Sequence, residues 1–74
     1  MKVYRYYCSY RPPMPGAIPR KGLVRVASYD YKQSISGRGA WGFVEYDREL
    51  TEKEIVDYEL WASVNNPLDY GEGK

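Results

Sequence analysis

Residues 2–10, KVYRYYCSY, alternate between two sets of side chains and predict a β-strand at the start of the chain. Aromatic residues are enriched in strands, and successive side chains of a strand point to opposite faces. The even positions from Tyr4 to Tyr10 hold three tyrosines and Cys8, so we expect this face to meet the core. The rest of a small domain must then pack around this aromatic strand.

Two stretches further along the chain have the same character. Residues 23–29, LVRVASY, and residues 41–48, WGFVEYDR, predict two more strands. Residues 30–40, DYKQSISGRGA, are polar and predict a loop that turns at Gly-Arg-Gly, with a weak strand over 31–35 as the alternative.

The start of a helix has a specific local pattern. Thr51 followed by Glu54 matches a capping box, in which each side chain accepts a hydrogen bond from the other residue's backbone N–H. The apolar spacing that follows predicts a short amphipathic helix ending near residue 60. Residues 61–64 fit either a continued helix or a short edge strand.

These elements predict a single α+β domain over residues 1–74: a small antiparallel sheet of three to four strands, with one short amphipathic helix packed on one face. Residues 68–74 form a polar tail that we expect to fray. A chain of 74 residues stabilises itself by only about 3–5 kcal/mol without help. Nine Tyr, two Trp and one Phe supply apolar area here, and homodimerisation is the alternative source.

Residues 11–22, RPPMPGAIPRKG, hold four of the five prolines. We interpret this proline-rich segment as a stiff crossover between two strands, pinned to the sheet by Met14 and Ile18. The alternative is a PxxP ligand, although the base directly before the first proline fits neither usual orientation. The candidate protein-contact residues come from this segment and from the helix: Arg11, Pro12, Pro13, Met14, Pro15, Glu52 and Asp57.

The charges are divided unevenly along the chain. Residues 1–40 carry eight bases and one acid, whereas residues 41–74 carry nine acids and three bases. The two halves neutralise each other if they pack together. Otherwise the basic half binds nucleic acid, or the seven carboxylates of residues 45–59 imitate a phosphate backbone. The candidate nucleic-acid contacts are Lys2, Arg5, Tyr7, Arg25 and Arg38.

The residue inventory argues against catalysis. The chain has no histidine, which removes Ser-His and Cys-His nucleophile pairs, and its one cysteine, Cys8, falls on the predicted core face. We therefore expect no enzyme activity, no metal site and no cofactor. No apolar run is long enough for a signal peptide or a membrane span. A lone thiol suits a reducing compartment, so we expect a cytoplasmic protein without membrane contact.

Three stretches together, residues 11–19, 40–46 and 50–60, resemble small proteins of phages and integrative elements, and a C-terminal segment of phage "defence against restriction" proteins. The resemblance implies a mobile-element context but assigns no role to any residue. We therefore expect a non-enzymatic interaction protein that modulates host defence by contacting a host or element protein. The alternative is a nucleic-acid-binding protein that uses the basic, Tyr-rich N-terminal half.

Overall fold

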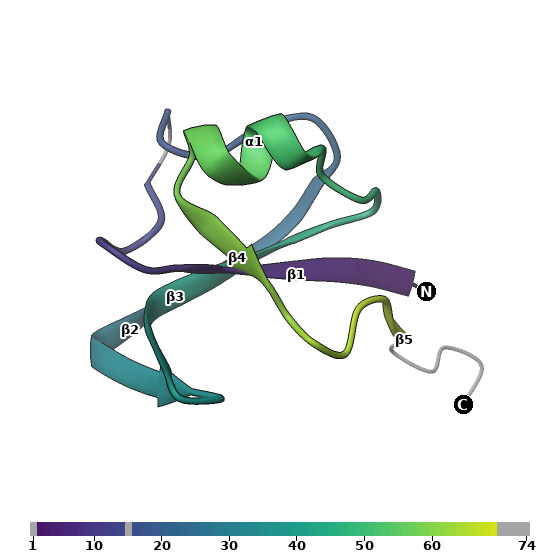
Figure 1. The fold of residues 1–74 in the computed structure, drawn as a ribbon. Coiled ribbons are helices and arrows are strands. Elements are labelled where there is room, and N and C mark those ends of the chain that lie inside the picture. Colours follow the sequence, from purple (N-terminus) through teal and green to yellow (C-terminus); the bar gives the residue numbers. More distant parts are fainter. Residues whose placement is uncertain (1, 15, 70–74) are drawn as a thin grey trace.

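The computed structural model describes residues 2–14 and 16–69. It forms one bent antiparallel sheet with a short helix beside it (Figure 1). The elements are β1 (Lys2–Cys8), β2 (Leu23–Ile35), β3 (Arg38–Tyr46), α1 (Glu52–Asp57), β4 (Leu60–Ala62) and β5 (Leu68–Asp69).

The sheet is antiparallel as expected, but the expected α+β class with a helix-packed face is wrong. Strands hold 51 % of the described residues and the helix only 9 %. The capping box at Thr51 and Glu54 is present, yet α1 ends at Asp57 and contains no buried residue. Glu59 then adopts a left-handed backbone with φ of 58°, which redirects the chain into β4.

β1 is the central strand of the sheet. Neighbouring strands follow the order β2-β3-β1-β4, and β5 pairs with the start of β1. β4 pairs with Tyr6 to Cys8, and β5 places Asp69 beside Lys2. Of the tail expected to fray, residues 68 and 69 thus form a strand, and residues 70–74 lie outside the described residues. The residues left open at 61–64 begin as a strand because β1 needs a partner for its second edge.

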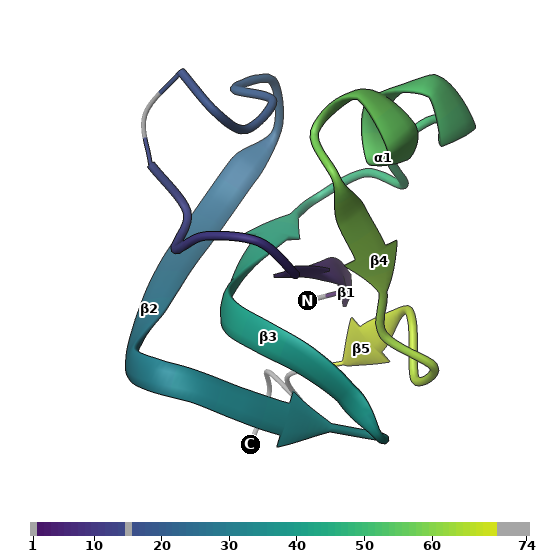
Figure 2. The same cartoon turned by 60° about the vertical axis from the view of Figure 1, so that its left-hand side comes forward.

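β2 extends well beyond its expected end. Ser36 and Gly37 both have positive φ, 52° and 82°, and they join β2 to β3 in a two-residue hairpin turn of the type that matches strand twist. The expected loop over 30–40 is therefore mostly strand. Four residues, 29–32, face Trp41 alone, and this bulge lets both strands turn a corner together (Figure 2).

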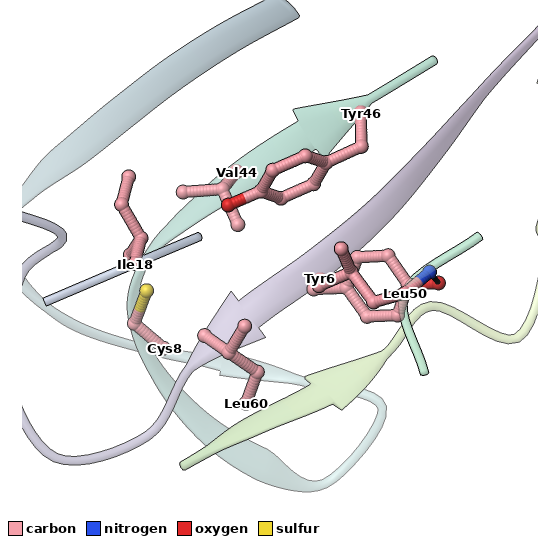
Figure 3. Close-up of a cluster of buried hydrophobic side chains, with 7 residues drawn as sticks. All are labelled: Tyr6, Cys8, Ile18, Val44, Tyr46, Leu50 and Leu60. Carbon is pink, nitrogen blue, oxygen red and sulfur yellow. Dashed lines mark hydrogen bonds between the residues drawn. The ribbon is translucent and has the colours of Figure 1, made fainter. Parts of the chain in front are cut away.

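Side chains are buried on both faces of β1, although we expected only the even-numbered face to meet the core. One cluster holds two even-numbered side chains of β1 together with residues from β3, β4 and the loops (Figure 3): Tyr6, Cys8, Ile18, Val44, Tyr46, Leu50 and Leu60. On the opposite face a second cluster holds Tyr7, Ala40, Phe43 and Trp61. Tyr10, expected in the core, is 71 % exposed beyond the end of the strand.

Candidate functional site

The proline-rich segment, residues 11–22, is attached to the sheet by its two ends. Ile18 is buried in the first cluster, and Pro13 and Pro19 are also buried. The Tyr46 hydroxyl donates a hydrogen bond of 2.6 Å to the Pro19 carbonyl, inside the protein. Ile18 thus packs on the sheet, as the crossover interpretation predicted for this residue.

Gly42 of β3 provides the space for this attachment. A Cβ added at this residue would lie 2.7 Å from Pro13 Cδ and would collide with the carbonyl oxygen of Ala27. Close approach of Pro13 to the sheet therefore requires glycine here. The close contact holds the segment beside β2 rather than away from it.

We expected Met14 to pin the proline-rich segment to the sheet. This expectation is wrong, because the Met14 side chain is 54 % exposed. It borders an open groove of about 360 Å³ between the proline-rich segment and the first half of β2. We call this the β2 groove. Its lining consists mainly of apolar side chains: Pro13, Met14, Gly16, Ile18, Arg20, Leu23 and Val26.

β2 also leaves one edge open along this groove. Within the described residues β2 pairs with β3 alone, so its other edge carries no strand. The apolar side chains of its first half are exposed: Leu23 by 37 %, Val24 by 42 % and Val26 by 44 %. An exposed apolar edge strand is a template for pairing with another chain.

One base lines the groove and two lie near it in the chain: Arg20 is part of the lining, Lys21 follows it, and Arg25 of β2 directs its guanidinium to Phe43 on the opposite face. Arg20, Lys21 and Arg25 are exposed, and none of them forms an ion pair in the part of the chain that the structure describes. The groove lining itself holds one base and no acid. The surface is therefore both apolar and positively charged.

Four of the five candidate nucleic-acid residues gather around the second aromatic cluster. The guanidinium groups of Arg5 and Arg25 lie 4.1 Å and 5.6 Å from the centre of the Phe43 ring. Arg38 lies 4.5 Å from the centre of the Trp61 ring, which in turn packs against Tyr7 at 4.6 Å. Lys2, at the start of β1, is not part of this group.

This arrangement leaves little room for base stacking. Tyr7, Phe43 and Trp61 are each less than 10 % exposed, at 6 %, 8 % and 6 %. Arg5 is held by the fully buried Glu45, with its Nη2 at 2.6 Å and its Nε at 2.8 Å from the same carboxylate oxygen. Of the five candidates, Arg25 and Arg38 present exposed cations at this site.

The acidic stretch of residues 45–59 is largely neutralised within the fold. Within residues 2–14 and 16–69, four of its seven carboxylates form ion pairs, and one of these four is buried. The pairs are Arg5–Glu45, Arg11–Glu59, Arg48–Glu54 and Lys53–Asp57. Two of them join the basic half of the chain to the acidic half, which agrees with mutual neutralisation and weakens the case for phosphate mimicry.

The remaining contact candidates do not share one surface. Arg11 pairs with Glu59, and Pro12 borders a small cavity of about 10 Å³ on the side nearer α1. Glu52 and Asp57 lie on α1, outside the lining of the β2 groove. Pro15 lies outside the described residues.

Cys8 is poorly suited to nucleophilic chemistry. Burial raises the pKa of its thiol from 9.0 to about 11, so the thiolate is scarce at neutral pH. Among residues 2–14 and 16–69, no group of three or more acidic or cysteine side chains is placed to hold a metal ion. No helix of the same residues is long and apolar enough to cross a membrane.

Reasoning from the sequence missed Leu23, Val26 and Arg20 as parts of a surface. LVRVASY has the apolar content of a buried strand, and nothing in its pattern shows that it lies at an edge. The base-rich, acid-free composition of residues 11–29 was the available signal.

Comparison with known protein families identifies the family of this chain. Residues 1–65 match the family model of the defence against restriction A C-terminal domain. The chain belongs to this family. The expected resemblance is thereby confirmed, and the protein is related to the phage defence-against-restriction proteins. No curated protein and no solved structure gives a match.

Proposed function

We propose that this member of the defence against restriction A C-terminal family is a non-enzymatic contact module. It binds a host or element protein in the cytoplasm through the β2 groove and thereby modulates host defence. The observation that carries the proposal is the combination of an apolar groove of about 360 Å³ with an open strand edge beside it.

Packing against the sheet holds part of the groove wall in place. Pro13, Ile18 and Pro19 are buried, and the close fit at Gly42 holds the segment against the sheet. A preorganised surface loses little conformational freedom on binding, and this favours affinity. Exposed methionine next to valine and leucine is typical of surfaces that contact proteins.

The test is capture of partners from nuclease-treated extract of a bacterial host that carries the element. We expect wild-type chain to retain a discrete protein, and Val26→Lys to lose it because a charge enters the apolar groove. The matched control is Val64→Lys, since Val64 is 81 % exposed and does not line the groove. Retention by Val26→Lys, or recovery of nuclease-sensitive species alone, contradicts the proposal.

Nucleic-acid binding is the second candidate, and one observation favours it: Arg25 and Arg38 are exposed near one aromatic cluster and form no ion pair within the described chain. Such binding weakens steeply with salt. We expect Arg25→Glu with Arg38→Glu to abolish it without unfolding the protein, unlike Arg5→Glu, which would place two acids together at a buried site. Absence of any mobility shift with DNA or RNA at low salt removes this candidate.

A further inference from the structure

We infer that the partner enters the β2 groove as an extended acidic segment, which adds a strand to the open edge of β2. This inference rests on the proposed function and specifies the chemistry of the partner. Strand addition uses backbone hydrogen bonds for affinity and side-chain pockets for specificity.

The open edge has a defined length. Residues 23–28 run alongside β3 with one irregularity, at Val24, and then the bulge of residues 29–32 turns the strand away. A bulge of this kind ends regular pairing on the outer edge. The added strand therefore spans about six residues, or roughly 20 Å at the rise of an extended chain.

The groove supplies the pocket for one side chain of that segment. Its volume of about 360 Å³ is large enough to hold one large apolar side chain. Leu23 and Val26, which line it, belong to the same strand whose edge is open. A large apolar side chain from an added strand can thus enter the groove while its backbone pairs with β2.

Charge decides the composition of the segment. Residues 11–29 hold four bases and no acid, and Arg20, Lys21 and Arg25 form no ion pair in the described chain. Carboxylates that flank the apolar anchor are attracted to these bases and steer the encounter. A second copy in the same place would instead bring the bases of two grooves together, so an acidic partner is favoured over a homodimer.

A random-peptide library selected on the folded chain tests the inference. We expect the enriched peptides to alternate apolar and other residues and to carry an excess of Asp and Glu. In NMR titrations they should shift the amide signals of residues 23–28. Replacing alternate peptide amides by N-methyl amides should weaken binding at least about tenfold, since the added strand loses its ladder hydrogen bonds.

Charge reversal provides the matched comparison. Arg20→Glu with Arg25→Glu should weaken the acidic peptides about tenfold or more and should favour basic ones in a repeated selection. Lys32→Glu, an exposed base in the bulge of β2 and outside residues 23–28, is the control and should change little.

The results that overturn the inference are specific. Enriched peptides without an acidic excess, shifts outside residues 23–28, insensitivity to N-methylation, or sedimentation of the free chain as a dimer through β2 each contradict it. If extract capture still depends on Val26 while the peptides fail, the contact module stands and only strand addition is wrong. If capture fails as well, both are wrong.

Discussion

β1 and the first half of β2, residues 23–28, have similar apolar content and opposite environments. β1 lies between β3 on one side and β4 and β5 on the other, and side chains on both of its faces are buried. β2 has one neighbouring strand among the described residues and exposes Leu23, Val24 and Val26. Position in the sheet, rather than composition, decides which strand is core and which is surface.

This difference arises because later strands pair with both edges of β1 but with only one edge of β2 in the described chain. The second edge of β1 is covered because the chain returns through β4 and β5. No later strand of the described chain pairs with the outer edge of β2, and the proline-rich segment borders β2 without adding a strand. The sheet thus closes around β1 and stays open at β2.

The largest expected difference in stability is between alanine substitutions of two tyrosines, one in β1 and one in β2. Tyr6 is 1 % exposed, and its hydroxyl accepts a hydrogen bond of 3.0 Å from the Leu50 amide. Tyr6→Ala should cost about 3–5 kcal/mol, enough to unfold a domain of this size. Tyr31→Ala, where the tyrosine is 64 % exposed, should change stability by less than about 0.5 kcal/mol. Urea unfolding followed by circular dichroism measures both, and similar losses would contradict the comparison.

A more closely matched comparison uses two valines that are paired between β2 and β3. Val26 pairs with Val44 in register, yet they are 44 % and 0 % exposed. Val44→Ala should destabilise the protein by about 2 kcal/mol through lost burial and the cavity left behind. Val26→Ala should cost less than about 0.5 kcal/mol. The same unfolding experiment decides, and an equal cost at the two positions would show that β2 is covered in solution.

A smaller effect is expected at the attachment of the proline-rich segment. Tyr46→Phe removes the donor to the Pro19 carbonyl and leaves that buried acceptor without its partner. The expected cost is about 1–3 kcal/mol. Tyr58→Phe is the control, because Tyr58 packs on the same cluster and its hydroxyl forms no hydrogen bond within the described chain. Thermal unfolding of the two variants should separate them, and equal melting temperatures would count against this attachment.

The smallest effect concerns pH and the start of α1, away from the groove. Two hydrogen bonds from Arg48, together with the Thr51 amide, lower the pKa of Glu54 from 4.5 to about 2. Its stabilisation is therefore present above about pH 4.5 and is lost as pH falls toward 2. Glu54→Gln should be less stable than wild type at pH 7, and the difference should shrink through this window. A difference that does not depend on pH would contradict the assignment, and Glu52→Gln serves as the control.

Local features of the fold can be predicted from the sequence, but which strands pair with one another cannot. The capping box and most of the strand predicted over residues 2–10 follow from local rules and are present, whereas the turn predicted at Gly-Arg-Gly lies at Ser36 and Gly37. Pairing of β4 with β1, and the extension of β2 through a bulge, depend on residues far apart in the chain. The helix was overestimated for the same reason, because an open edge on β1 favoured a strand at Leu60–Ala62.

The candidate site divides in the same way. The excess of bases over residues 11–29 and the proline-rich segment can both be seen in the sequence. Residues of the segment, Arg20 among them, line the β2 groove. Which face of the segment is buried depends on Gly42 and on the Tyr46 hydroxyl, which lie more than twenty residues away. Burial of Ile18 with exposure of Met14 could not be read from their spacing.

Residue-resolved amide hydrogen exchange of the free chain tests the central claim most directly. Backbone N–H groups bonded within a closed sheet exchange slowly, whereas those on an open edge exchange readily. We expect protection throughout residues 3–8 of β1 and an alternation of protected and fast-exchanging amides over residues 23–28 of β2. Uniform protection of residues 23–28, as strong as that of β1, would mean that the edge of β2 is already covered and would contradict a surface left open for a partner.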